Sequence, residues 1–157
     1  MKWNGDCFPQ GMDNQKKDEG SREKLRKLVH EFDTAMLVTL GAGHPGRARP
    51  MALAKAGMAS DDLQNDQLYF VTDRDSQKVD EISADAQVVV AFQNSRQFIS
   101  LSGTVEVTQD AALIETLWSE SWRVWFPKGP ADPGICILRF EPTEGEYWDN
   151  AGLRGLR

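Results

Sequence analysis

The stretch LYFVTDRDSQKVDEISA, from Leu68 to Ala84, decides the fold of this chain. Its first five residues, LYFVT, are apolar, aromatic or β-branched and predict a strand. The DRDS segment that follows is rich in turn-forming residues, and Asp75 or Ser76 is a good N-cap for a helix. We therefore expect a strand, a tight turn and a helix here, with the helix separating strands that a hairpin would otherwise join.

Lys78 falls in the first turn of that helix, where the helix dipole disfavours a cation. A bound anion would remove the conflict, because the free backbone N–H groups, the Ser76 hydroxyl, Thr72 and the Lys78 ammonium could converge on one phosphate. The alternative is an exposed Lys78 that pairs with Asp75 or Asp80 and adds little stability. These residues alone leave both interpretations open.

A second basic pattern lies in the segment RARPMALA, residues 47–54, which alternates as a strand does. Arg47, Arg49 and Met51 then share one face. Burying two unpaired arginines is costly, so either this end of the face opens to water or an anion lies across it. Pro50 interrupts the hydrogen bonding of the strand and predicts an edge strand or a bulge.

The remaining elements follow from apolar periodicity. A helix is expected to begin near Ser21 and to end before Ala35, and residues 109–125 return to helical spacing. Further strands are expected at 35–40, 87–92, 98–108, 135–140 and 142–148. Gly103 interrupts the longest alternation and predicts a bulge or a close approach of two backbones. Strands outnumber helices, which is typical of a mainly β (α+β) domain built as a small barrel or sandwich with helices at its ends.

Length and composition indicate one domain in 157 residues, with an N-terminal arm at 1–20, a domain at 21–150 and a polar tail at 151–157. The net charge of -6 and the lack of a basic run argue against general nucleic-acid binding. The two cysteines form no CxxC pair, no metal-binding motif is found, and the apolar runs are too short for a bilayer. We therefore expect a soluble, cytoplasmic protein that holds no metal.

Taken together, five pieces of sequence resemble the flavin-binding split β-barrels related to pyridoxamine 5'-phosphate oxidase, and within them the general-stress-protein branch. The resemblance covers residues 22 to about 149. The pieces are GRARPM at 46–51, LYFVTDRDSQK at 68–78, RQFISLSG at 96–103, WFP at 125–127 and EYWD at 146–149. The resemblance implies a six- to seven-stranded antiparallel split β-barrel with flanking helices, and FMN or alternatively FAD as cofactor.

The resemblance also assigns roles at the flavin phosphate. Arg49 matches the arginine that binds the phosphate in the oxidases, and Lys78 matches the lysine that grips it. Ser76 and the strand-end residue Thr72 join them, and Arg47 assists.

Around the flavin ring, the resemblance implies further contacts. Pro50 and Met51 run under the cofactor, and Val71 lines the ring. Gln97 approaches the polar edge of the isoalloxazine, and Trp148 packs beside it.

Because such sites are shared between two subunits, the resemblance implies a homodimer. An aromatic stripe of Trp118, Trp122 and Trp125 is more typical of core or subunit interface than of a cofactor site. In the dimer it would serve the interface, and Trp125 would form part of the pocket wall.

Two departures bear on activity. Ala54 stands where the oxidases have a lysine, with Lys55 one place away, and the chain lacks their C-terminal Arg-Leu-His segment. Oxidation of pyridoxamine phosphate is therefore not expected, and no catalytic residue is assigned. We expect a flavin-dependent oxidoreductase of the general-stress type with a nicotinamide donor. The alternatives are a non-catalytic flavin carrier or sensor, and a β-barrel interaction module without flavin.

Overall fold

A computed structural model of the chain describes residues 2–3, 14–41, 45–55 and 66–149. Its strands are β1 (Lys2–Trp3), β2 (Thr34–Thr39), β3 (Arg47–Ala52), β4 (Leu68–Asp73), β5 (Gln87–Gln93), β6 (Gln97–Thr108) and β7 (Ile135–Asp149). Its helices are α1 (Asn14–His30), α2 (Gln77–Ala84) and α3 (Ala111–Leu117), followed by the 3-10 turns η2 (Glu120–Val124) and η3 (Gly129–Ala131).

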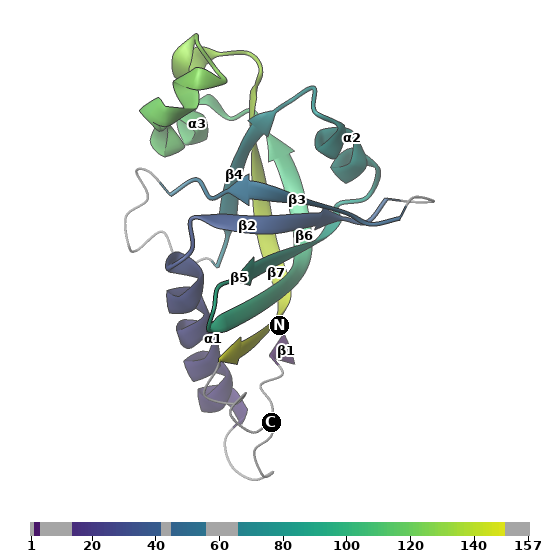
Figure 1. The fold of residues 1–157 in the computed structure, drawn as a ribbon, viewed down its shortest axis with the longest axis vertical. Coiled ribbons are helices and arrows are strands. Elements are labelled where there is room, and N and C mark those ends of the chain that lie inside the picture. Colours follow the sequence, from purple (N-terminus) through teal and green to yellow (C-terminus); the bar gives the residue numbers. More distant parts are fainter. Residues whose placement is uncertain (1, 4–13, 42–44, 56–65, 150–157) are drawn as a thin grey trace.

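Six antiparallel strands, β2 to β7, curl into a nearly closed barrel (Figure 1). The strand order is β1-β7-β6-β5-β2-β3, and β4 pairs with β7 outside this path. The barrel is split between β3 and β4, which are joined by the single bridge Leu53–Phe70. The predicted antiparallel split barrel with flanking helices is confirmed.

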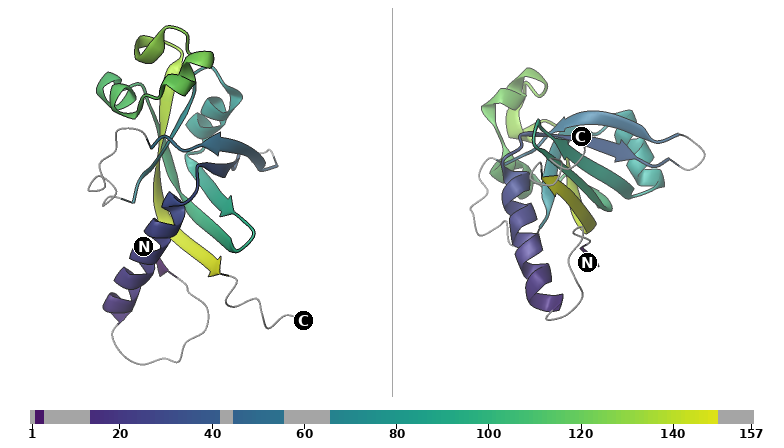
Figure 2. Two further views of the ribbon diagram at one scale, coloured as in Figure 1. Left: turned by 60° about the vertical axis from the view of Figure 1, so that its left-hand side comes forward. Right: turned by 60° about the horizontal axis from the view of Figure 1, so that its bottom comes forward.

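Two apolar clusters fill the molecule. The larger one lies inside the barrel and includes Leu37, Phe70 and Phe140, all fully buried. The smaller one packs the end of the barrel against α3 and η2, through Leu117 and Trp122. Helix α1 lies at one end of the molecule and α3 with the short turns at the other (Figure 2).

Helix α1 packs Leu25, Leu28 and Val29 into the core, as predicted, and Phe32 joins them from just beyond the end of the helix. It begins at Asn14 and not near Ser21. The residues from 14 to 20, NQKKDEG, carry no apolar period, so the pattern that located the helix could not locate its first turns. Most of the predicted arm, residues 1 and 4–13, and the tail at 151–157 lie outside the described residues.

The two strands predicted at 135–140 and 142–148 are one strand, β7. Pro142 does not end it, because it lies opposite a shift of register between Ser102 and Gly103 on β6. A Cβ atom on Gly103 would lie 2.1 Å from the carbonyl oxygen of Glu141. The predicted bulge and close approach at Gly103 are therefore confirmed.

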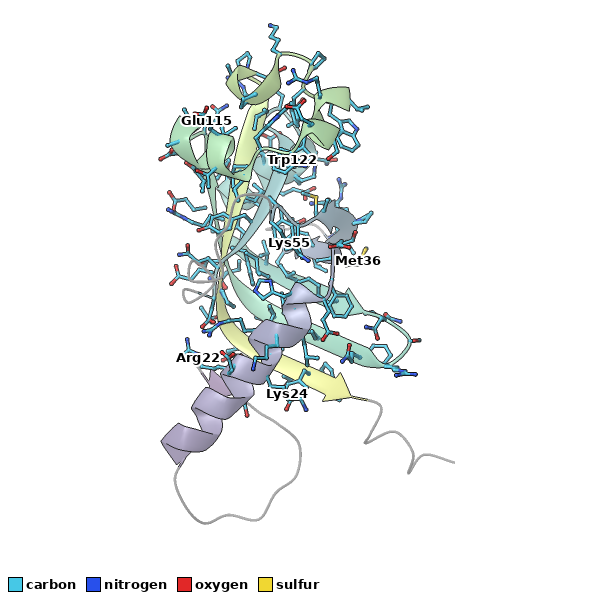
Figure 3. The ribbon with its side chains drawn as sticks, turned by 90° about the vertical axis from the view of Figure 1, so that its left-hand side faces the viewer. Arg22, Lys24, Met36, Lys55, Glu115 and Trp122 are labelled. Atoms are coloured by element: carbon cyan, nitrogen blue, oxygen red, sulfur yellow. The ribbon has the colours of Figure 1, made fainter. Side chains whose placement is uncertain are left out.

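The predicted helix at 109–125 breaks after Leu117, and η2 follows it. This break divides the aromatic stripe. Trp122 is buried against the end of the barrel (Figure 3), with Trp118 edge-on to it at 5.8 Å between ring centroids. Trp118 and Trp122 therefore belong to the smaller apolar cluster, whereas Trp125 is 69% exposed and does not.

Candidate functional site

The turn between β4 and α2 builds the N-terminal end of the helix as the sequence predicts. The backbone N–H of Asp75 donates to Asp73 Oδ1 at 2.8 Å, and that of Ser76 donates to the Asp73 carbonyl at 3.2 Å. Ser76 is the N-cap, and α2 begins at Gln77. Its hydroxyl lies 3.5 Å from the Thr72 hydroxyl and does not bond to the helix. Lys78 is thereby fixed as the second residue of α2.

Lys78 turns back toward the end of β4. Its Nζ donates to Thr72 Oγ1 at 2.8 Å, and Thr72 itself is buried. Burial lowers the pKa of Lys78 from its ordinary value, and repulsion by Arg49 lowers it further. Within the described residues, Lys78 forms no ion pair with Asp75 or Asp80. The exposed alternative considered above is therefore wrong. Asp73 and Glu81 act on the ammonium group from nearby, but neither forms an ion pair with it among the described residues.

The two arginines of β3 lie on the inner face of the strand, as the alternation predicts. Arg49 Nη2 donates to Glu81 Oε2 at 2.7 Å, and Arg47 Nη1 donates to Glu81 Oε1 at 3.3 Å. Thr39, at the end of β2, donates to the same Oε2 at 2.6 Å. This hydrogen bond from Thr39, and then the one from Arg49, hold the pKa of Glu81 below its ordinary value.

Sequence reasoning missed Glu81 and Thr39. A signal existed for Glu81, because residues three apart lie on the same side of a helix and Glu81 follows Lys78 at that spacing. For Thr39 the signal was weaker, since it depends on the pairing of β2 with β3, which places Thr39 opposite Arg47.

One donor of this group remains without a partner. Arg49 Nη1 is buried and makes no hydrogen bond to any residue that the structure describes. A buried unsatisfied donor costs about 1–3 kcal/mol. The cations Arg47, Arg49 and Lys78 stand against the carboxylates of Glu81 and Asp73, which leaves a formal charge of +1. A phosphate, with several acceptor oxygens and a double negative charge, fits this cationic cluster.

The residues predicted to lie around the flavin ring are distributed differently. The Met51 side chain is 7% exposed and belongs to the barrel core, whereas Pro50 is exposed on the outer face of β3. Val71 is half-buried and packs against the smaller apolar cluster. The structure thus brings the predicted phosphate residues together more closely than the predicted ring residues.

Gln97 and Trp148 lie at the other end of β7. Thr72 pairs with Cys136 near the start of β7, whereas Gln97 pairs with Asp149 and Trp148 with Phe98 near its end. Twelve residues of strand between Cys136 and Trp148 correspond to a contour length of about 40 Å. Within one chain, these two side chains are therefore not brought to the cationic cluster.

Two hollows lie elsewhere, between α1 and the start of β4. The larger, of about 170 Å³, is lined in part by His30, Lys55 and Tyr69. The charges around these hollows are largely matched: Lys55 donates to the His30 carbonyl and to Asp33, and Arg22 and Arg26 converge on Asp66. Figure 3 shows Arg22 and Lys55 on this side of the molecule. Matched charges make these hollows weaker candidates than the cationic cluster.

Other kinds of site have less support. Among residues 2–3, 14–41, 45–55 and 66–149, no three histidine, cysteine or acidic side chains are grouped so as to hold a metal ion. Cys136 is a buried free thiol, and burial, with Asp73 nearby, raises its pKa to about 11. Over the same residues, no helix has the length and apolar character needed to cross a bilayer.

Comparison with known proteins supports the resemblance. The sequence pattern of the family described as "Pyridoxamine 5'-phosphate oxidase like" matches residues 20–155. Protein bli-3 of Neurospora crassa is 27% identical over 110 residues, which cover 64% of this chain and 50% of bli-3. The chain thus matches about half the length of that relative.

Two solved structures share the fold. The general stress FMN/FAD binding protein of Xanthomonas citri has a TM-score of 0.70 at 25% identity, covering 84% of this chain and 90% of its own. A Clostridium acetobutylicum protein related to general stress protein 26 of B. subtilis has a TM-score of 0.69 at 23% identity, with the same coverage. With its split barrel and the family pattern over residues 20–155, this chain belongs to the pyridoxamine 5'-phosphate oxidase-like family.

Proposed function

We propose that this protein binds a flavin, FMN or FAD, and that the cationic cluster holds the flavin phosphate. The observation that carries the proposal is the buried, partnerless Nη1 of Arg49 beside a lysine whose pKa is lowered by burial. A phosphate at this place would accept hydrogen bonds from Arg49, Lys78 and Ser76 and would offset their charge. The name of the Xanthomonas citri relative, an FMN/FAD binding protein, supports the same ligand.

The proposed activity is that of a flavin-dependent oxidoreductase of the general-stress type. A bound flavin supplies hydride and electron transfer, and the protein supplies binding and orientation. The residues of the cationic cluster are suited to the second task only, since arginine, lysine and hydroxyl groups grip a phosphate. A nicotinamide donor is the proposed source of electrons.

The test of binding is a titration of the purified protein with FMN, followed by flavin fluorescence and by the absorbance of the protein after dialysis. We expect retained colour and quenched fluorescence at stoichiometric FMN. A protein that stays colourless with excess FMN and with excess FAD would exclude the flavin proposal and favour an interaction module.

The test of activity is the oxidation of NADH or NADPH by the flavin-loaded protein, with flavin reduction followed by absorbance under anaerobic conditions. Reduction by either nucleotide supports the oxidoreductase. Tight flavin binding without reduction would contradict it and would favour a carrier or sensor.

We further propose a homodimer with the flavin between the two subunits. The ring-side residues Gln97 and Trp148 lie far along β7 from the cationic cluster, so one chain alone leaves the predicted site incomplete. The outer face of the barrel also exposes large apolar side chains: Met36 is 40% exposed and Leu40 43% exposed. Figure 3 shows Met36 directed away from the barrel. Such a face is suited to a self-complementary contact across a twofold axis.

Sedimentation velocity tests this dimer. The wild-type protein should sediment as a dimer at micromolar concentration, and Met36→Asp should shift it toward the monomer and release flavin. Ala112→Asp, at an exposed position of α3, is the matched control and should change neither. A wild-type monomer that holds flavin fully would exclude a shared site.

A further inference from the structure

We infer that Glu81 is a positioning residue, which holds the Arg49 guanidinium so that its free Nη1 is presented to a terminal phosphate dianion. In the proposed complex, the Glu81 side chain contacts Arg49 and does not contact the ligand. The inference rests on the proposed phosphate site and adds to it a residue that the resemblance described under the sequence analysis did not include.

The carboxylate of Glu81 is fixed from three directions. Thr39 Oγ1 donates to Oε2 at 2.6 Å, and Thr39 is 1% exposed, so this donor cannot turn to water. Arg49 Nη2 donates to the same oxygen at 2.7 Å, and Arg47 Nη1 approaches Oε1 at 3.3 Å. The Glu81 side chain is only 15% exposed. Its position is thus set by the ends of β2 and β3 together with α2.

The contact between Glu81 and Arg49 uses one side of the guanidinium. The carboxylate engages Nη2, while the buried donor without a partner is Nη1. Because the guanidinium is planar and rigid, fixing Nη2 also fixes the direction of Nη1. A donor that is already oriented loses less conformational freedom when a ligand binds. A carboxylate that blocked the site would instead be expected to take the buried donor for itself.

The charge of the cluster supports the same role. With Glu81 and Asp73 present, the three cations and two carboxylates carry a formal charge of +1. A phosphate monoester has its second pKa near 6 and is close to a dianion at neutral pH. The cluster therefore keeps a net positive charge that attracts a phosphate although Glu81 is present.

The experiment compares FMN with riboflavin, which has the same ring and ribityl chain but lacks the phosphate. The ratio of their dissociation constants measures the contribution of the phosphate contacts. In Glu81→Gln we expect FMN binding to weaken about tenfold, as for one lost charge-assisted hydrogen bond, and riboflavin binding to change less than twofold. Loss of FMN affinity is expected although the substitution makes the cluster more positive.

Thr39→Val is the second variant, because it leaves the charge of the cluster unchanged and removes only the hydroxyl that holds Glu81. It should weaken FMN binding in the same direction by about threefold, a smaller loss because the Arg49–Glu81 contact remains. It keeps the inference testable if Glu81→Gln fails to fold. Glu106→Gln is the matched control, since Glu106 pairs with Arg139 on β6 and β7 and is 62% exposed. It should leave both ligands unaffected.

Two outcomes are distinguishable. If Glu81→Gln and Thr39→Val bind FMN as tightly as the wild type, or more tightly, the positioning role is wrong while the phosphate site stands. If the wild-type protein binds riboflavin as tightly as FMN, the proposed phosphate site itself is wrong.

Discussion

Two clusters in this protein are built alike, each from two arginines that converge on one carboxylate. Near α1, Arg22 and Arg26 both bond to Asp66, the second at 2.7 Å. Near α2, Arg47 and Arg49 both bond to Glu81. Burial acts to raise the pKa of Asp66, but the hydrogen bonds from its two arginines outweigh burial and hold that pKa below its ordinary value.

The clusters differ in the other charged side chains that lie around the two arginines and their carboxylate. Arg26 also bonds to Glu23 at 2.8 Å, and Lys27 pairs with the same carboxylate at 3.4 Å, so the α1 cluster has three cations and two carboxylates. Lys78 joins the α2 cluster as a third cation, and the carboxylates that act on it are those of Asp73 and Glu81.

Each cluster contains one buried arginine nitrogen without a partner among the described residues, but the two atoms are not equivalent. In the α1 cluster it is Nε of Arg22, next to the aliphatic stem of a side chain that is 42% exposed. In the α2 cluster it is the terminal Nη1 of Arg49, whose side chain is 21% exposed. The comparison teaches that a terminal unsatisfied nitrogen beside a half-buried lysine, more than net charge, separates a candidate ligand site from a structural anchor.

The largest expected effect concerns the two arginines. Arg49→Gln should weaken FMN binding about 10- to 100-fold, because a charge-assisted hydrogen bond contributes about 1.5–3 kcal/mol. Arg22→Gln should leave FMN binding within a factor of two. Fluorescence titration measures both. Equal losses in the two variants would show that the clusters are not functionally different.

Lys78 provides the next test, because it is half-buried, whereas the lysine of the α1 cluster, Lys27, is exposed. Lys78→Met should weaken FMN binding about tenfold, less than the loss of an arginine that can donate from two nitrogens. Riboflavin binding should stay unchanged. Lys27→Met, at an exposed position of α1, is the control. An unchanged FMN affinity in Lys78→Met would remove this residue from the phosphate site.

For the free energy of unfolding, in contrast to FMN binding, we expect the α1 cluster to be important. Asp66→Asn should lower the free energy of unfolding by about 1–2 kcal/mol, since it leaves two arginines without their shared acceptor. Asp33→Asn, which breaks the ion pair of a 95% exposed aspartate with Lys55, should cost less than about 0.5 kcal/mol. Urea unfolding without ligand measures both. A loss no larger in Asp66→Asn than in Asp33→Asn would contradict the anchoring role.

The smallest expected effect is on pH dependence. A carboxyl whose pKa is lowered by folding stabilises the protein above its unfolded pKa, which is about 3.9 for aspartate, and this contribution is lost as the pH falls through the folded value. Unfolding free energies between pH 5 and pH 3 should therefore decrease less steeply in Asp66→Asn than in the wild type. If the unfolding free energies of the two proteins fell in parallel between pH 5 and pH 3, Asp66 would not contribute to the pH dependence of stability.

The sequence predicted the features that depend on neighbouring residues. The strand, turn and helix from Leu68 to Ala84 are confirmed, because each has a local signature. The alternation of β3 correctly placed Arg49 and Met51 on the inner face, and Pro50 correctly predicted an edge strand. These signals need only the period of a strand or the chemistry of a turn.

Features that depend on distant residues were missed or remain untested. Glu81 and Thr39 meet only because β2, β3 and α2 come together, and no local pattern contains that information. The continuity of β7 across Pro142 depends on its pairing with β6, where Thr143 is an extra residue between the partners of Ser102 and Gly103. The roles of Gln97, Trp125 and Trp148 at a flavin stay predictions, since they require a second copy of the chain.

Strand β7 also has a consequence for the order in which the protein can fold. It is the last of the described strands along the chain, yet it pairs with β1, β4 and β6. Among the described strands, β7 is the only one to form a ladder with β4. Since long-range strand pairing is slow and must wait for both partners, the barrel cannot close during synthesis until the final strand has left the ribosome. Until then, β4 and the turn that orients Lys78 lack their strand partner, so the candidate phosphate site forms late.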